Sequence, residues 1–143
     1  MDKEEWKYEY WFACIRKVRN KTKKKIRENM GSAKDIFNIE ETTLKCFTER
    51  EEERYEILSG RKKWDLETMY EKLLVDRITF LPYFHPDYPK TLENLAIPPY
   101  ALYLKGHVIP KNTVKAAIVG ARHCSPYGEK MAIEFGEALA KCG

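Results

Sequence analysis

The sequence has few cysteines, and they follow no pattern that would bind a metal. Cys14, Cys46, Cys124 and Cys142 lie far apart and form no C-x-x-C pair, and the three histidines share no ligand spacing. Neither a zinc site nor a disulfide framework is indicated, so we interpret the cysteines as reduced, buried thiols. We expect no metal and no cofactor.

A long hydrophobic run is also missing. No stretch of about 18 apolar residues occurs, and the first ten residues, MDKEEWKYEY, alternate between charged and aromatic side chains. Neither a membrane span nor a signal peptide is therefore indicated. With 143 residues, 43% of them hydrophobic and 34% charged, the chain can form one ordinary domain or two small ones. We expect a cytoplasmic protein without a membrane partner.

Acidic residues are absent from one stretch of the first half. Residues 16–27, RKVRNKTKKKIR, carry eight basic side chains, and the whole chain has a net charge of +4. A cluster of this density attracts phosphate backbones. The predicted auxiliary basic patch consists of Arg16, Lys17, Arg19, Lys21, Lys23, Lys24, Lys25 and Arg27. The alternative is a solvated helix face, partly balanced by the acidic run EREEER at residues 49–54.

Residues 4–60 have the pattern of several short helices. One apolar stripe recurs at helical spacing: Trp11, Cys14, Ile15 and Val18. Gly31 is a natural C-cap, and Ser32 is a suitable N-cap for the next segment. A longer helical pattern covers residues 50–74, where we predict a kink or break at Gly60 because glycine weakens a helix interior. We expect a helical N-terminal module at residues 1–75, of the helix-hairpin-helix or SAM-like kind.

The composition changes in residues 76–112, which we interpret as a linker that leads into a sheet. Prolines forbid a long helix there, and ITFL at 78–81 and YALYLKG at 100–106 are predicted strands. Residues 88–95 are predicted to form one or two helical turns. The aromatic side chains in this region favour a packing seam between modules, with base stacking as the alternative: Phe80, Tyr83, Phe84 and Tyr88.

The last part, residues 113–143, has the order strand, loop, helix. VKAAIVG at 114–120 is a predicted strand, because its residues 116–119 are uninterrupted apolar sequence, typical of a strand buried on both faces of a parallel sheet. Ser125 is placed as an N-cap with Pro126 at the first helical position. The fold class is therefore α/β, with the helical module followed by the first strand and helix of a doubly wound, Rossmann-like sheet.

The loop between this strand and helix is a candidate anion site, because free backbone N–H groups and the helix dipole point there. Arg122 adds a guanidinium suited to phosphate oxygens, although a structural ion pair is the alternative for it. The fingerprint G-x-G-x-x-G is absent, and so is the P-loop G-x-x-x-x-G-K-[ST]. The sequence therefore indicates neither a nicotinamide cofactor nor ATP.

Two stretches resemble a known family. HPDYPKTLENLAIPPYALYLKG at 85–106, followed by VKAAIVGARHCSPYGEKMA at 114–132, is similar to the DNA-processing protein A (DprA, or Smf) family. That family has a helical N-terminal module, the Y-P…P-P-x-x-L-Y-x-K-G linker strand and a Rossmann-like domain that opens with G-[SA]-R-x-x-S/T-x-Y-G. The resemblance covers about residues 64–143.

The resemblance implies single-stranded DNA binding without sequence specificity and without catalysis. It also implies protection of incoming strands and help in loading the RecA recombinase during natural transformation. The phosphate-binding positions that match the family motif are Gly120, Ala121, Arg122, Ser125, Tyr127 and Gly128. Ala121 stands where many members have serine, so one phosphate-binding hydroxyl is missing.

One strand and one helix cannot complete a doubly wound sheet, so we expect a fragment of a longer protein. The resemblance implies a homodimer only in the full-length protein. Two alternatives remain for the function. One is a nucleotide-binding or nucleotide-hydrolysing Rossmann-like enzyme related to phosphoribohydrolases, and the other is a helical protein-interaction module.

Overall fold

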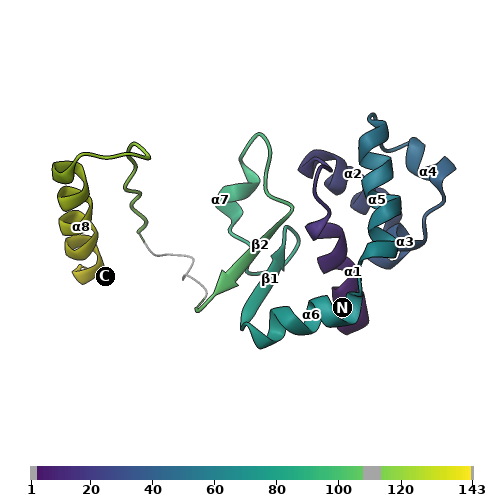
Figure 1. Ribbon diagram of the computed structural model, residues 1–143, viewed down its shortest axis with the longest axis horizontal. Coiled ribbons are helices and arrows are strands. Elements are labelled where there is room, and N and C mark those ends of the chain that lie inside the picture. Colours follow the sequence, from purple (N-terminus) through teal and green to yellow (C-terminus); the bar gives the residue numbers. More distant parts are fainter. Residues whose placement is uncertain (1–2, 108–113, 143) are drawn as a thin grey trace. The chain divides into compact units, whose positions relative to one another are not determined.

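The computed structural model describes residues 3–107 and 114–142 (Figure 1). The chain divides into two compact units, Met1–Val108 and Ile109–Gly143. The described part is a mixed structure of helices with one small two-stranded antiparallel sheet. The predicted boundary between the linker and the last part, at residues 112 and 113, lies outside the described residues.

The first unit contains seven helices and both strands of the described chain. Its helices are α1 Lys3–Cys14, α2 Asn20–Met30, α3 Ala33–Asn38, α4 Glu41–Lys45, α5 Glu51–Lys63, α6 Leu66–Val75 and α7 Lys90–Glu93. Its strands are β1 Ile78–Pro82 and β2 Ala101–Lys105. The second unit contains α8, Pro126–Lys141.

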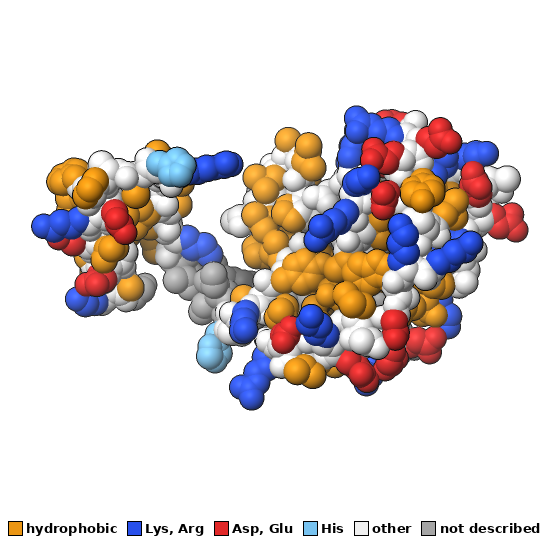
Figure 2. Space-filling view, viewed as in Figure 1, with side chains coloured by type: hydrophobic (Ala, Val, Ile, Leu, Met, Phe, Trp, Pro, Cys, Tyr) orange, Lys and Arg blue, Asp and Glu red, His pale blue; other side chains and the backbone are white. Residues whose placement is uncertain are grey.

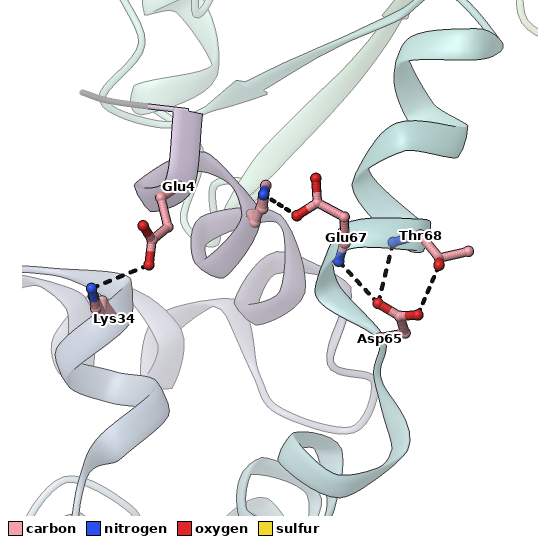
Figure 3. Close-up of polar contacts among 6 residues, drawn as sticks. Glu4, Lys34, Asp65, Glu67 and Thr68 are labelled. Atoms are coloured by element: carbon pink, nitrogen blue, oxygen red, sulfur yellow. Dashed lines mark hydrogen bonds and ion pairs between the residues drawn. The ribbon is translucent and has the colours of Figure 1, made fainter.

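The core of the first unit is built around α1, which packs against α3, α6 and β1. Five helices contribute large, fully buried apolar side chains to it: Trp11, Phe12, Ile26, Ile36, Leu44 and Ile57. Ion pairs reinforce the periphery of α1, where Lys7 contacts Glu67 of α6 and Glu4 contacts Lys34 of α3 (Figure 3). The unit is therefore held mainly by apolar burial around one central helix.

The caps predicted between α2 and α3 are confirmed. Gly31 ends α2 with φ +79°, a left-handed conformation that favours glycine, and its N–H donates to the Arg27 carbonyl at 3.2 Å. The Ser32 hydroxyl oxygen accepts a hydrogen bond from the Asp35 N–H at 3.0 Å. These two residues therefore end one helix and start the next.

The spacing predicted that the first apolar stripe lies on one helix, and this prediction was wrong. Helix α1 ends at Cys14, and Ile15 and Val18 follow in the connection to α2, where both are buried. Lys17 in that connection has φ +63°, a left-handed backbone conformation found mostly in turns. The turn folds Ile15 and Val18 back onto the core, so they are buried without a helical period.

The break in the long helical pattern lies at Trp64 and Asp65, so the prediction of a break at Gly60 was wrong. The Asp65 carboxylate caps α6 by accepting hydrogen bonds from the N–H groups of Glu67 and Thr68 at 3.2 and 3.3 Å (Figure 3). Gly60 is buried inside α5, and a Cβ there would lie 3.3 Å from Trp11 Nε1. The glycine therefore allows close packing and does not interrupt the helix.

The two strands predicted in the linker are confirmed, and they form an antiparallel pair. The register joins Ile78 to Lys105 and Pro82 to Ala101, and α7 confirms the helical turns predicted between them. Phe80 packs edge-on against Trp6 and Tyr10 of α1, with ring centroids 5.7 and 5.5 Å apart. The hairpin is therefore part of the helical unit.

In the second unit, the strand predicted at 114–120 is not formed within the described residues. Val114 and Val119 are 91% and 90% exposed, and Ile118 is half exposed. A strand exists only when its backbone groups pair with a neighbour, and the described residues supply none for this segment. The helical part of the prediction is confirmed, because α8 begins at Pro126 after Ser125.

Candidate nucleic-acid interface

The turn at residues 120–128 leads directly into α8. The Ser125 hydroxyl oxygen accepts the Gly128 N–H at 3.2 Å, and the Ser125 carbonyl accepts the Glu129 N–H at 3.0 Å. Ser125 is therefore the helix cap that the sequence predicted. Because Pro126 has no N–H and Gly128 is already bonded, an anion at this helix start would depend strongly on neighbouring side chains.

Arg122 and Tyr127 supply exposed side chains beside this cap. Arg122 is exposed, and in the part of the chain that the structure describes no ion pair engages it. Tyr127 is 72% exposed, and no atom lies close to the position of a Cβ on Gly120. Ala121 is exposed as well. The predicted phosphate-binding positions thus form one accessible turn, with a guanidinium available for an anion.

The predicted basic patch is divided, because several of its side chains serve the fold. Arg19 donates from Nε to Glu53 Oε1 at 2.8 Å and from a terminal nitrogen to Glu49 at 3.0 Å. Lys17 pairs with Glu52 and Glu56 at 3.2 and 3.5 Å. The acidic run at 49–54 therefore neutralises part of the basic run, as the alternative interpretation expected.

Arg19 and Glu53 also connect α2 to α5. Burial alone would raise the pKa of the Glu53 carboxyl, but hydrogen bonds from Arg19 and Thr22 outweigh burial and lower that pKa. Hydrogen bonds to Glu53 and Glu49 raise the pKa of Arg19. The pair is ionised at neutral pH and fixes the start of α2.

Two further basic residues of the run point inward. The Lys23 ammonium donates to the Ala13 carbonyl at 2.6 Å, and burial lowers the pKa of Lys23 to about 8. Arg27 Nε donates to Glu9 Oε2 at 2.8 Å. Arg16, Lys21, Lys24 and Lys25 keep exposed side chains, so these four are the members of the run that can reach a ligand in solution.

Sequence reasoning missed the buried polar cluster that Arg27 enters. Glu9 is fully buried and accepts hydrogen bonds from Arg27 and from the Tyr100 hydroxyl. Burial raises the pKa of Glu9, and the two hydrogen bonds oppose this shift only in part. An acidic residue within the sequence KYEYWF gives no local signal for burial, because its partners are 18 and 91 residues away.

The aromatic residues of the linker divide between core and surface. Phe80 and Tyr88 are buried, and the Tyr88 hydroxyl donates to the Pro99 carbonyl at 2.8 Å. Tyr83 is half-buried and Phe84 is 37% exposed. Packing therefore accounts for Phe80 and Tyr88, whereas Tyr83 and Phe84 leave ring surface available to solvent.

The four cysteines are free, but Cys14 is only partly buried and the other three are exposed, so the prediction of buried thiols was wrong. Across residues 3–107 and 114–142, no group of three histidine, cysteine or acidic side chains is placed to hold a metal ion. Among the described helices, none has the length and apolar character needed to cross a bilayer.

Helix N-termini and arginine side chains both commonly bind phosphate groups in proteins. Residues 79–143 match the model of the family DNA recombination-mediator protein A. This match confirms the resemblance predicted from the sequence, and it includes β1 from its second residue, all of β2, the turn and α8. The matched domain indicates DNA processing in recombination. No curated protein and no solved structure matches the chain significantly.

Proposed function

We propose that this protein binds single-stranded DNA without sequence specificity through the turn at residues 120–128. The observation that carries the proposal is the exposed Arg122 beside the capped start of α8, within the residues that match the recombination-mediator family. A guanidinium and backbone N–H groups bind phosphate oxygens and read no base identity. Gly120 lets the backbone approach the phosphate, and Tyr127 lies at the entry to the helix.

The proposed role has no catalytic step. The protein protects single strands in the cytoplasm and helps load a RecA recombinase during natural transformation, and in its full-length form it acts as a homodimer. The family match supports a role in recombination, while the recombinase, the dimer and transformation follow from the resemblance alone. The exposed members of the basic patch supply additional long-range attraction for the strand.

We also propose that residues 113–143 open a Rossmann-like domain. In that domain, residues 114–120 form a strand between parallel neighbours, and α8 covers one face of the sheet. The exposed apolar side chains of Val119, Phe135 and Leu139 support this proposal, because such side chains are normally covered in a folded domain. The division into a helical module at 1–75, a linker at 76–112 and this domain belongs to the same proposal, as does the SAM-like character of the module.

The test is a fluorescence anisotropy titration of a labelled single-stranded oligonucleotide, with a duplex competitor, at two salt concentrations. Arg122→Ala is expected to weaken binding about tenfold and to reduce the salt dependence by about one phosphate contact. Lys130→Ala is the matched control, since it removes one positive charge from an exposed position on α8. Equal affinity of wild type and Arg122→Ala would refute the assignment of the turn.

A further inference from the structure

A small hollow lies on the surface of the first unit, between α2 and the segment that contains α7. Its volume is about 260 Å³. Its lining includes three tyrosines and three charged side chains: Tyr83, Tyr88, Tyr100, Lys24, Glu28 and Glu93. Pockets for drug-sized ligands usually begin at about 300 Å³, so this hollow fits a single flat ring system. Figure 2 shows hydrophobic side chains gathered over the α7 segment, with basic side chains between it and the helices.

Tyr83 is the aromatic side chain in the hollow that keeps ring surface available. Tyr88 and Tyr100 are only 2% and 4% exposed, whereas Tyr83 is half-buried. Its N–H donates to the Tyr100 carbonyl at 2.9 Å, and its ring packs 5.5 Å from that of Tyr100 and 5.2 Å from that of Phe84. Backbone and ring contacts therefore hold Tyr83 in place as a rigid surface for stacking.

Positive charge lies directly beside this aromatic surface. Lys24 Nζ is 5.2 Å from the centroid of the Tyr83 ring, and Arg27 Cζ is 5.0 Å from that of Phe84. Arg27 is held by its ion pair with Glu9. The Lys24 side chain is 47% exposed, and its ion pair with Glu28 is long, at 3.9 Å, and therefore weak. The Lys24 ammonium can therefore leave the ring for a stronger anionic partner.

The acidic side chains decide which ring system fits. Glu28 and Glu93 both line the hollow, so a phosphate is repelled from its interior and is left at the Lys24 rim. Their carboxylates accept hydrogen bonds, as a glutamate does from the exocyclic amino group of cytosine. Thymine has no exocyclic amino group.

We propose that this hollow binds one unpaired nucleobase that carries an amino group, stacked on Tyr83. On binding, Lys24 moves from the face of the Tyr83 ring to the adjacent phosphate, and a carboxylate of the lining accepts the base amino group. The choice of a nucleic acid as ligand rests on the proposed function, but the site is separate in sequence from the turn at 120–128. Base–aromatic stacking accounts for the affinity expected of such a contact.

The test uses the full chain and oligo-dC that contains one 2-aminopurine, a base whose fluorescence is quenched when it stacks. Tyr83→Leu removes the stacking ring, and Tyr83→Phe keeps it. Lys24→Ala removes the ammonium, and Lys25→Ala is the matched control from an exposed neighbour on the same helix. We expect about fivefold weaker binding for Tyr83→Leu and for Lys24→Ala, loss of quenching in Tyr83→Leu, and wild-type behaviour for Tyr83→Phe. Lys25→Ala is expected to lose only the smaller long-range attraction of one charge of the basic patch.

Oligo-dT is expected to bind several-fold more weakly than oligo-dC, and equal affinities would overturn the assignment of an amino-bearing base. Unchanged quenching in Tyr83→Leu, or equal effects of Lys24→Ala and Lys25→Ala, would overturn the stacking site. Circular dichroism checks the fold of each variant. If Tyr83→Leu unfolds, the comparison of Lys24→Ala with Lys25→Ala decides the question, because both positions are exposed.

Arg122→Ala in the same titration separates this inference from the proposed function. If only the Tyr83 and Lys24 variants lose affinity, the hollow is supported and the turn is refuted as a DNA site. If only Arg122→Ala loses affinity, the turn is supported and the hollow is refuted. If wild-type protein binds neither oligonucleotide, both proposals are overturned.

Discussion

Arg27 Nε lies 2.8 Å from Glu9 Oε2, and this ion pair joins α2 to α1 inside the protein. Glu9 is fully buried, and the side chain of Arg27 is 14% exposed. Tyr100 directly precedes β2, and its hydroxyl donates a hydrogen bond to the other oxygen of the same carboxylate. One buried carboxylate thus connects two consecutive helices to the hairpin, with partners 18 and 91 residues away in the sequence.

Removal of one partner from this ion pair is expected to lower the free energy of unfolding. Arg27→Met leaves Glu9 charged and buried with only Tyr100 as a partner, so we expect a loss of about 3 kcal/mol in the free energy of unfolding. The double variant Glu9→Leu with Arg27→Met is expected to lose less, because no uncompensated charge remains. Urea unfolding of both, with Lys25→Met as an exposed control, measures the difference. A double variant less stable than Arg27→Met would contradict this account.

The buried ammonium of Lys23 predicts a pH dependence of stability. Burial lowers the pKa of Lys23 in the folded state to about 8, against 10.5 in an unfolded chain. Between these values the unfolded state binds more protons, so the free energy of unfolding rises with pH. We expect a rise of about 1–2 kcal/mol between about pH 7.5 and 9.5 in urea titrations.

The same titrations of Lys23→Met isolate this contribution, because methionine carries no proton in that range. A wild-type slope equal to that of Lys23→Met would show that Lys23 is not the source. Above about pH 10 the trend reverses, since the folded protein holds several tyrosine protons more tightly than the unfolded chain. Burial raises the pKa of Tyr100 well above its ordinary value, and that of Tyr83 rises as well.

Substitution of Gly60 by alanine is expected to destabilise the protein, although Gly60 lies in a helix interior. Alanine there would normally gain about 1 kcal/mol from helix propensity. The new Cβ would lie 3.3 Å from Trp11 Nε1 and 3.7 Å from Ile15, and Trp11 is fully buried and has little room to move. We expect a net loss of about 1 kcal/mol or more from overpacking. Thermal unfolding of Gly60→Ala, compared with Ser59→Ala on the same helix, tests the sign.

Ser125 allows helix capping to be separated from phosphate contact. Asparagine and aspartate cap helices about as well as serine, so Ser125→Asn and Ser125→Asp are both expected to keep the circular dichroism signal of α8. Aspartate adds a negative charge beside Arg122, and we expect it to weaken binding of single-stranded DNA severalfold while asparagine leaves it near wild type. If Ser125→Asn weakens binding as much as Ser125→Asp, the hydroxyl itself contacts the phosphate.

The sequence by itself determined the local features of this protein. Gly31, Ser32 and Ser125 were predicted as caps because each acts on backbone groups only a few residues away. The hairpin strands and the family resemblance over the matched residues could also be read from short stretches. These features depend on neighbours in the chain, and a sequence displays such neighbours directly.

Only the tertiary structure decided which charges serve the fold and which face solvent. Lys23 and Lys24 are adjacent and identical in type, yet one is buried against Ala13 and the other lies exposed over Tyr83. Gly60 was predicted to break a helix, and it instead makes room for Trp11, 49 positions earlier in the printed sequence. Burial and charge pairing depend on partners distant in the chain, and packing brings those partners together only when the protein folds.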